Sequence, residues 1–437
     1  MVGAFFRRLD MAAKTIPFSE SEARAIAAEY PTPIHIYDEA GIRSGAREMR
    51  AGFIDSGLTA YRNYFALKAL PNPSIMEILM DEGMGFDCSS LAELMLCERV
   101  GAHNKPFENG FSRIMFTSNE TLAHEYRKAV ELGAIINLDD ITHIAYFTEQ
   151  VGPLPEFVCC RYNPGPMRTF SKANDFIIGN PADAKFGMTR DQLLAAYAVM
   201  RDVGVKSFGL HTMVASNEIH PSAFVETARM LLELVNEISD SLGVQFDMIN
   251  LGGGFGVAYK PEDEPLVFAE IADGVAAVYK ELITDQGRHP LTVVTENGRV
   301  VTGPHGYLLT GIQHTKSTYR EYLGVDACMA NLMRPGMYGA YHHISILGKP
   351  EDSPTQVYDV VGSLCENNDK FAQNRELPVS APGDLMVIHD SGAHGHAMGF
   401  NYNGKLRSAE ILLAEDRSPR LIRRGETYDD LFATLDI

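Results

Sequence analysis

A repeated strand–helix rhythm between residues 61 and 295 constrains this chain most strongly. Short β-branched and aromatic runs recur there, separated by segments with helical periodicity. The expected strands are residues 61–66, 84–88, 113–117, 134–138, 157–162, 207–210, 247–251 and 292–295. Eight strand–helix units over about 250 residues favour a closed (β/α)8 barrel of the TIM type. An open doubly wound sheet is the alternative, and it would need fewer strands.

The connecting segments carry helical signals of their own. Ser90-Leu91-Ala92-Glu93 matches a capping box, in which serine and glutamate satisfy the first free amides of a helix. Residues 223–242 place apolar side chains on one helical face, namely Phe224, Ala228, Leu231, Leu232, Val235 and Ile238. Both patterns are typical of helices that cover a parallel sheet.

The chain changes character after Gly303. Residues 357–362, 385–389 and 408–413 are β-rich runs separated by Pro, Gly and Asp, and helical periodicity is scarce. We therefore expect a second domain built on an antiparallel β-sheet, which the alternating stretch 32–37 could complete. The expected organisation is an N-terminal segment that joins the β domain (1–42), the barrel (43–304) and the C-terminal β domain (305–437).

Composition narrows the class of partner. The 437 residues include 38 Lys and Arg against 57 Asp and Glu, a formal charge of −19, which disfavours nucleic acid and anionic membranes as partners. Six scattered cysteines form no CxxC pair, so we expect no metal site, no disulfide framework and a reduced, cytoplasmic protein. The start, Met1–Arg8, does not match a signal peptide, and no run approaches the ~20 apolar residues of a membrane helix.

Polar residues lie at or directly after the ends of the expected strands, where a barrel of this type carries its active groups. In chain order these are Lys68, Asp87, Arg161, His211, the glycine loop 252–256, Glu296 and Arg299. A lysine, acids, an arginine, a histidine and a glycine-rich loop at one end of a barrel indicate a reactive site.

Three of these features have a specific chemical use. Lys68 lies in the apolar run 64–72, where loss of water would favour a neutral amine that can form a Schiff base with a carbonyl or pyridoxal phosphate. The glycine loop could bind phosphate oxygens through its amides. Glu296 beside a pyridine nitrogen would keep that nitrogen protonated. The alternatives are a surface lysine, a flexible turn, and an acid paired with Arg299.

Motifs along nearly the whole chain resemble the fold-type III, alanine-racemase-like pyridoxal-phosphate decarboxylases, and within them the diaminopimelate decarboxylases. The barrel carries YFALKALPN, FDCSSLAEL, CCRYNPG, DAKFGM, INLGGGFG and TENGR in the family's order. The β domain carries MRPGMYGAYHHI, CENNDKFAQNRELP, GDLMVIHDSGAHG and NYN. The CENND…RELP stretch is the most specific of these.

The resemblance implies pyridoxal 5'-phosphate as cofactor and a role for each matching residue. The implied cofactor site comprises Lys68 as the Schiff-base lysine, Asp87, Arg161, His211, Met213, Ser216, Gly253, Gly254, Glu296 and His394. The implied substrate site comprises Arg299, Arg334, Tyr338, Glu366 and His394. Cys365 and Glu366 would reach across a homodimer interface, where the glutamate reads the distal amine and the cysteine assists proton return.

Two positions depart from the family's pattern. The family usually has HxHxGS, whose second histidine stacks on the cofactor ring, and this chain has Met213 there. Either Met213 packs on the ring or His211 shifts inward. His394 replaces a tyrosine of the cofactor and substrate pocket, and its imidazole would supply the hydrogen bond at shorter reach.

The expected activity is decarboxylation of a small amino acid, meso-2,6-diaminopimelate, to L-lysine and CO2, the last step of lysine biosynthesis. The same chemistry on carboxynorspermidine or a carrier-bound amino acid is the first alternative. An amino-acid racemase fits less well, because racemases of this fold pair the pyridine nitrogen with arginine and this chain offers Glu296. A non-catalytic pyridoxal-phosphate carrier would not need the second domain.

Overall fold

The chain forms two units, which a computed structural model describes for residues 14–166, 180–350 and 352–436. The expectation for Met1–Arg8 lies outside these residues. The β unit comprises Met1–Asp38, Ala258–Pro265 and Gly306–Ile437, and the barrel unit comprises Glu39–Val257 and Leu266–His305. The sequence did not indicate that Ala258–Pro265 belongs with the β unit.

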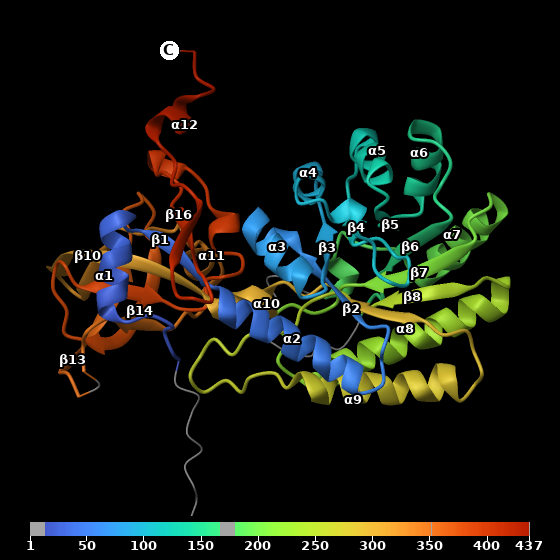
Figure 1. Cartoon of the computed structure of the whole chain (residues 1–437), viewed down its shortest axis with the longest axis horizontal. Helices are drawn as coiled ribbons and strands as arrows, with labels where there is room; N and C mark the ends of the chain where they lie inside the picture. The colour runs from blue at the N-terminus through green and yellow to red at the C-terminus, as the bar shows by residue number, and fades with distance from the viewer. Residues whose placement is uncertain (1–13, 167–179, 351, 437) are drawn as a thin grey trace, which may run out of the picture. The chain divides into compact units, whose positions relative to one another are not determined.

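The barrel unit contains eight parallel strands that pair in sequence order and close on themselves (Figure 1). They are β2 (Arg62–Ala66), β3 (Gly85–Cys88), β4 (Ile114–Thr117), β5 (Ile135–Leu138), β6 (Phe157–Tyr162), β7 (Ser207–Thr212), β8 (Phe246–Asn250) and β9 (Thr292–Thr295). Every expected strand is present, with ends that differ by at most two residues from the sequence-based bounds. The TIM-type barrel is confirmed, and closure excludes the doubly wound sheet.

A helix follows each of these strands, another precedes the first of them, and the helices lie outside the barrel (Figure 1). They are α2 (Glu39–Asp55), α3 (Pro73–Asp81), α4 (Leu91–Arg99), α5 (Ala123–Glu131), α6 (Thr142–Gln150), α7 (Arg190–Asp202), α8 (Pro221–Leu242), α9 (Phe268–Tyr279) and α10 (Arg299–Thr302). All six expected apolar residues of α8 are buried. Ser90 caps α4 as expected, but the Glu93 carboxylate accepts from the Ser89 amide and hydroxyl.

The barrel interior is filled by apolar side chains rather than by a channel. One buried cluster joins inward-facing residues from six strands, namely Tyr64, Met115, Ile135, Cys159, Met248 and Val294. A filled interior leaves the strand ends as the place where polar groups can meet a ligand.

The β unit is built on one nine-stranded sheet, whose main path has the order β14-β13-β11-β10-β1-β16-β17. Off this path, β15 pairs with β10, and β12 pairs with β15. The strands are β1 (Ile34–Asp38), β10 (Gly306–Ser317), β11 (Glu321–Val325), β12 (Ile344–Ile346), β13 (Thr355–Val361), β14 (Lys370–Pro378), β15 (Leu385–Ile388), β16 (Ala409–Leu413) and β17 (Pro419–Arg423). The expectation that the N-terminal strand completes this domain is confirmed, because β1 lies between β10 and β16.

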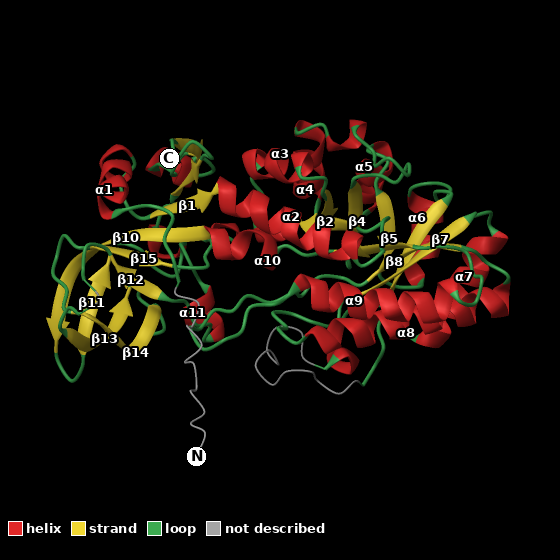
Figure 2. Cartoon of the chain, turned by 60° about the horizontal axis from the view of Figure 1, so that its bottom comes forward, coloured by secondary structure: helices red, strands yellow, loops and turns green. Residues whose placement is uncertain are grey.

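The expectation of a purely antiparallel sheet is wrong. The β1–β16 and β11–β13 pairs are parallel, so the sheet is mixed. In the part of this unit that the structure describes, the α-helices are α1 (Glu20–Glu29), α11 (Arg334–Tyr338) and α12 (Tyr428–Phe432). Helix α1 packs Ala23 and Ile26 against one apolar face of the sheet (Figure 2).

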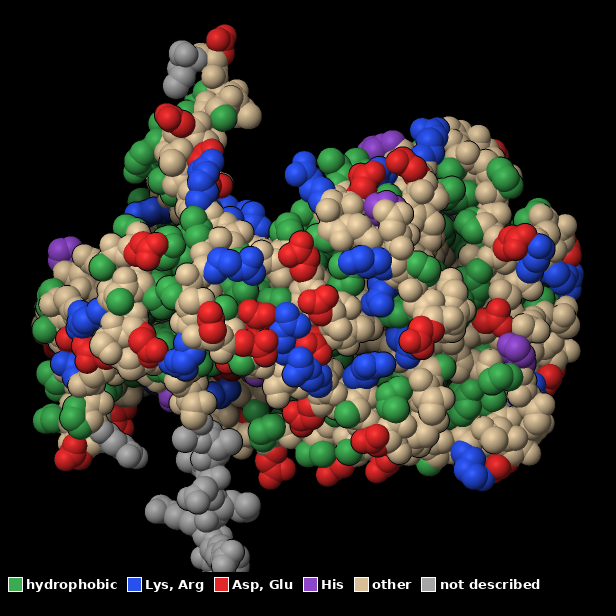
Figure 3. Space-filling model, in the orientation of Figure 1, with side chains coloured by type: hydrophobic (Ala, Val, Ile, Leu, Met, Phe, Trp, Pro, Cys, Tyr) green, Lys and Arg blue, Asp and Glu red, His purple; other side chains and the backbone are tan. Residues whose placement is uncertain are grey.

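Charged side chains of both signs are interspersed on the face shown in Figure 3. The formal charge of −19 is therefore not gathered into one acidic patch on that face. Within residues 14–166, 180–350 and 352–436, none of the helices has the length and apolar character needed to cross a bilayer.

Candidate active site

Lys68 lies in a 3₁₀ turn, Leu67–Ala69, directly after β2. Leu67 and Ala69 are buried in the core, whereas Lys68 is exposed. The apolar run 64–72 is thus a strand followed by a turn, and the turn directs the lysine away from the core. This differs from the expectation that apolar burial removes water from the amine, because Lys68 itself is exposed between two buried neighbours.

Glu296, the residue after β9, is the centre of a buried hydrogen-bond network. Its Oε2 lies 3.1 Å from His211 Nε2, and its Oε1 accepts from Asn250 Nδ2 at 2.7 Å. All three side chains are no more than 7% exposed. His211 and Asn250 are register partners near the ends of β7 and β8, so adjacent strands hold both carboxylate oxygens.

The ionisable groups at these strand ends shift one another's pKa. Burial opposes ionisation of Glu296, but His211 and Asn250 outweigh it and hold the pKa of Glu296 below its usual value. Burial, followed by the Glu296 charge, raises the pKa of Asp87 well above its usual value. The Lys68 ammonium favours the ionised form of both acids, which places its charge near them. The site therefore combines an amine with two acids whose pKa values are shifted in opposite directions.

The glycine loop after β8 is bonded to the same network. The Gly252 amide donates to Asn250 Oδ1 at 2.9 Å, and Gly252 O accepts from the Glu296 amide at 2.8 Å. Gly252 and Gly254 have φ values of +70° and +99°, a backbone conformation that other residues adopt at a cost. A β-carbon at Gly253 would lie 2.5 Å from Glu296 O. These contacts restrict the loop to residues without side chains.

Met213 lies against this loop, with its Sδ 3.2 Å from the Gly253 amide that donates to it. Its neighbour in the motif, His211, is engaged with Glu296. His211 and Met213, the two alternatives for the ring contact, therefore have different partners here: the imidazole contacts Glu296, and the thioether contacts the glycine loop. Ser216 follows in the half-buried segment between β7 and α8.

Two asparagines that the sequence interpretation missed organise the site. Asn250 connects Glu296 to Gly252, as described above. Asn63 in β2 accepts from the Asn297 amide and the Thr295 hydroxyl, each at 2.8 Å, and donates to Asn297 O at 3.0 Å. Both asparagines are buried in strands whose other buried residues are apolar, which is the sequence signal that could have identified them.

Arg161 forms an ion pair with an acid other than Glu296. Arg161 Nη1 donates to Asp139 Oδ1 at 3.2 Å, and its guanidinium carbon lies 4.4 Å from the centre of the Phe186 ring. Arg299 is the first residue of α10 and is half-buried. The structure thus brings Lys68, Asp87 and Glu296 together electrostatically and places Arg161 in a different ion pair.

In the β unit, Arg334 is buried and Tyr338, at the other end of α11, is 42% exposed. Arg334 Nη1 lies 2.8 Å from His342 Nε2, and its guanidinium carbon lies 4.7 Å from the Tyr259 ring centre. Arg334 is therefore a cation held in a polar and aromatic setting.

The remaining predicted residues of the β unit lie in loops. Cys365 and Glu366 follow β13 and are exposed. The Cys365 amide donates to Asn403 Oδ1 at 2.8 Å, and a hydrogen bond with Glu366 raises the pKa of Tyr402, so the CENN and NYN motifs meet. His394 is half-buried in the loop after β15 and has φ +55°.

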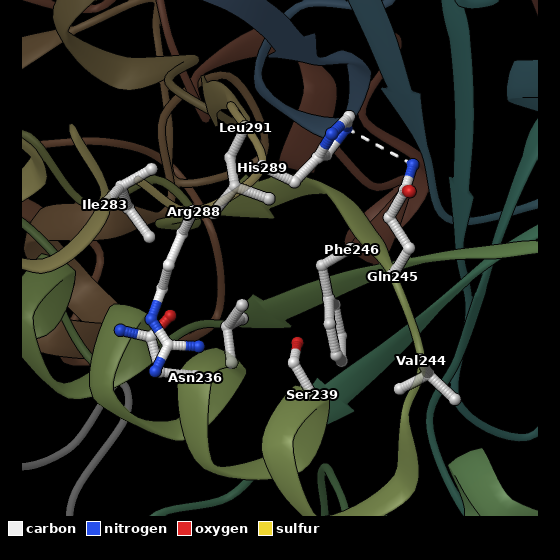
Figure 4. A pocket seen from close by; sticks show the side chains of 10 residues that line it. Asn236, Ser239, Val244, Gln245, Phe246, Ile283, Arg288, His289 and Leu291 are labelled. Atoms are coloured by element: carbon white, nitrogen blue, oxygen red, sulfur yellow. Dashed lines mark hydrogen bonds between the residues drawn. The ribbon is translucent and has the colours of Figure 1, made fainter. Parts of the chain in front are cut away.

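A separate cavity of about 270 Å³ lies beside the N-terminal ends of β8 and β9 (Figure 4). Its polar residues are already bonded: Arg288 pairs with Asp240 at 2.8 Å, and His289 lies 2.9 Å from Asp247. Because it lies at the opposite strand ends from Glu296, we do not assign it to the active site.

Comparison with known proteins identifies the class that this fold and site define. The family model for the pyridoxal-binding domain of pyridoxal-dependent decarboxylases matches residues 42–303, more than half of the chain, so the chain belongs to that family. It is a pyridoxal-phosphate-dependent decarboxylase of the diaminopimelate decarboxylase type.

Individual relatives match over nearly their full length. Protein TabA of Pseudomonas amygdali pv. tabaci is 42% identical, with 95% of each chain covered. Diaminopimelate decarboxylase of Methanothermobacter thermautotrophicus is 32% identical, over 94% of this chain and 93% of that protein. The structure of M. jannaschii diaminopimelate decarboxylase in complex with L-lysine superposes with a TM-score of 0.85 at 27% identity, over 95% of this chain and 94% of that one.

The residues present fit pyridoxal phosphate, the cofactor of this family. The glycine loop brings its backbone at Gly253 close to the backbone of Glu296, without side chains that would block a phosphate. Glu296 itself is a buried carboxylate whose pKa is lowered. Asp87 Oδ1 and His211 Nδ1 are buried and have no hydrogen-bond partner within the described part of the chain. Buried polar atoms without partners are expected where a ligand supplies the missing bond.

Proposed function

We propose that this enzyme decarboxylates meso-2,6-diaminopimelate to L-lysine and CO2, the last step of lysine biosynthesis. The observation that carries the proposal is Glu296, an acid that His211 and Asn250 hold in its ionised form at a strand end near Lys68. The choice of substrate is supported by the relatives named diaminopimelate decarboxylase and by the L-lysine complex of a structural relative.

Pyridoxal phosphate supplies the electron sink that accepts the electrons left behind when CO2 departs. In our proposal Lys68 holds the cofactor covalently, and the amides of Gly253 and Gly254 with Ser216 receive its phosphate. Glu296, whose pKa is lowered, would stabilise a proton on the pyridine nitrogen of the bound cofactor. His211 and Asn250 orient that carboxylate.

Substrate recognition is assigned to cationic and polar residues. Arg299, Arg334 and Tyr338 would bind the carboxylates, and Glu366 would bind the distal amine. We propose that Cys365 and Glu366 act in the site of a second subunit of a homodimer, since both are exposed in the single chain. The homodimer and a cytoplasmic location stay predictions from the sequence.

A second candidate is the same reaction on another amino acid. It is supported by the higher identity to Protein TabA than to the archaeal diaminopimelate decarboxylase, 42% against 32%. Met213 and His394, which depart from the motif of the family, are the residues through which the pocket could differ.

A substrate panel tests the proposal. CO2 release should be measured with meso-diaminopimelate, L-lysine, L-ornithine and carboxynorspermidine, with Lys68→Ala as the inactive control. We expect kcat/KM for meso-diaminopimelate to exceed the others by ~100-fold or more, because unsatisfied buried polar groups penalise wrong substrates strongly. Absence of CO2 release from meso-diaminopimelate, with release from another amino acid, would establish the second candidate.

A further inference from the structure

Lys14, the first described residue, joins three parts of the β unit that are far apart in sequence. Its Nζ donates to both carboxylate oxygens of Asp390, at 2.8 and 3.0 Å, and to Ala258 O at 2.6 Å. The Lys14 side chain is 19% exposed and that of Asp390 is 3% exposed. A buried ion pair with further hydrogen bonds is sensitive to the loss of one partner, because the other charge is then left unpaired.

Asp390 also responds to Arg334, the cation to which a substrate carboxylate is assigned. Burial raises the pKa of Asp390 to about 6, while Lys14 and, to a smaller extent, Arg334 lower it. Lys14 and Arg334 carry one positive charge each and Asp390 one negative charge. With Lys14 in place the three groups have a net charge of +1, and without it their net charge is zero while Asp390 is ionised.

Asp390 also begins the loop that carries His394. Both residues have φ +55°, an uncommon conformation for residues other than glycine that persists only when the surroundings enforce it. Between them, the Ser391 amide donates to Gly306 O at 2.8 Å. The two bonds from Lys14 to the Asp390 carboxylate thus fix the start of this strained loop.

We propose that Lys14 is a positioning residue for substrate recognition: by pairing with Asp390 it keeps the charge around Arg334 net positive and fixes the loop that presents His394. This inference rests on the proposed function, in which Arg334 binds a substrate carboxylate. It assigns a role to the chain that precedes α1, which the motifs of the barrel and the β domain did not include.

Steady-state kinetics of the cofactor-loaded enzyme test the effect on substrate. Lys14→Met should raise KM for meso-diaminopimelate about tenfold and leave kcat within about twofold. Lys14→Arg keeps the charge and should stay close to wild type. Lys14→Met/Asp390→Asn restores the net charge of +1 and should recover most of the KM. Lys349→Met is the matched control, since Lys349 pairs with Asp384 at 3.0 Å elsewhere in the same unit.

Thermal unfolding measures how much the Lys14–Asp390 ion pair contributes to stability, and this measurement needs no substrate. The other ionisable groups whose charges act on Asp390 or Lys14 are Arg334, Tyr307, Tyr341, His343 and His389. Burial lowers the pKa of both histidines, that of His389 to about 3, and raises that of both tyrosines, whereas the pKa of Asp390 is about 6.

The raised pKa of Asp390 determines the direction in which stability changes with pH. Its protonated form is favoured by folding, so stability is lost as pH rises through about 6, and the loss is larger without Lys14. Lys14→Met should therefore lower Tm little at pH 5 and by ~3 °C or more at pH 8. The Asp390→Asn second substitution should remove this pH dependence.

Each possible outcome supports or overturns one of three assignments: the role of Lys14 in recognition, the ion pair, or the proposed function. An unchanged KM in Lys14→Met, or a double variant that is worse than the single one, overturns the role in recognition. A Tm difference that does not change between pH 5 and 8 overturns the ion pair. A wild-type enzyme that is inactive on meso-diaminopimelate overturns the proposed function alone, because the Tm comparison does not depend on substrate. If Lys14→Met fails to fold at pH 8 and the double variant folds, the ion pair is supported.

Discussion

The barrel unit and the β unit prepare their functional residues in opposite ways. In the barrel, Glu296, His211 and Asn250 are buried and bonded to one another, so a single chain fixes their geometry. In the β unit, Cys365 and Glu366 are exposed in loops. The difference supports the proposal that one chain fixes the acid network by itself, whereas Cys365 and Glu366 act in the site of a second subunit.

The test with the largest expected effect replaces Lys68, the proposed attachment point of the cofactor in the barrel unit. Lys68→Ala should lower decarboxylation by ~10³-fold or more, because no other amine replaces the nucleophile that holds the cofactor. CO2 release gives the rate, and mass spectrometry of the borohydride-reduced protein locates the cofactor on a peptide. Lys68→Arg is the matched control, since it keeps the charge near Asp87 and Glu296 without a usable amine. A cofactor-modified peptide elsewhere in the chain would refute the assignment.

A second test removes charge from the buried network and leaves its shape. Glu296→Gln keeps the size and the contact with Asn250, but it cannot stabilise a proton on the ring nitrogen. We expect kcat to fall by ~10²–10³-fold, the range found when one preorganised electrostatic group is lost. Asn250→Ala should cost less, because His211 still holds one carboxylate oxygen. Stopped-flow or steady-state rates at saturating cofactor check both; equal losses in the two variants would contradict the hierarchy.

The same contrast explains what could be predicted from the sequence. Lys68, Asp87, His211 and Glu296 were identified because a polar residue at the end of an apolar strand stands out against its neighbours. The partners Asn250 and Asn63 were not, because hydrogen bonds between strands depend on register, which periodicity does not encode.

The exposure of Lys68 and the direction of strand pairing in the β unit also could not be predicted from the sequence. The apolar run around Lys68 indicated burial, but the turn that follows β2 sends this one side chain outward. The parallel β1–β16 pair joins segments separated by most of the chain, and no local pattern distinguishes it from an antiparallel one. Long-range pairing is therefore the part of the β unit that only the structure supplies.

The finest test asks whether the exposed residues act in their own subunit or in a partner. Glu366→Ala should lower kcat/KM by ~30-fold, because truncating one member of a charge pair that is desolvated in a complex costs at least ~2 kcal/mol. Its Tm should stay near wild type, since the side chain is exposed in the single chain. Lys68→Ala and Glu366→Ala are then refolded together in equal amounts.

If Glu366 acts across the interface, half of the dimers are mixed, and each mixed dimer has one site with both residues intact. Activity should then return to about a quarter of the wild-type value, as expected for a two-fold symmetric dimer with shared sites. If Glu366 acts within its own chain, no site in the mixture has both residues, and activity per chain stays at about half that of Glu366→Ala alone, because half of the chains lack Lys68. The mixture therefore separates a substrate half completed by the partner from one that the β unit completes for its own barrel.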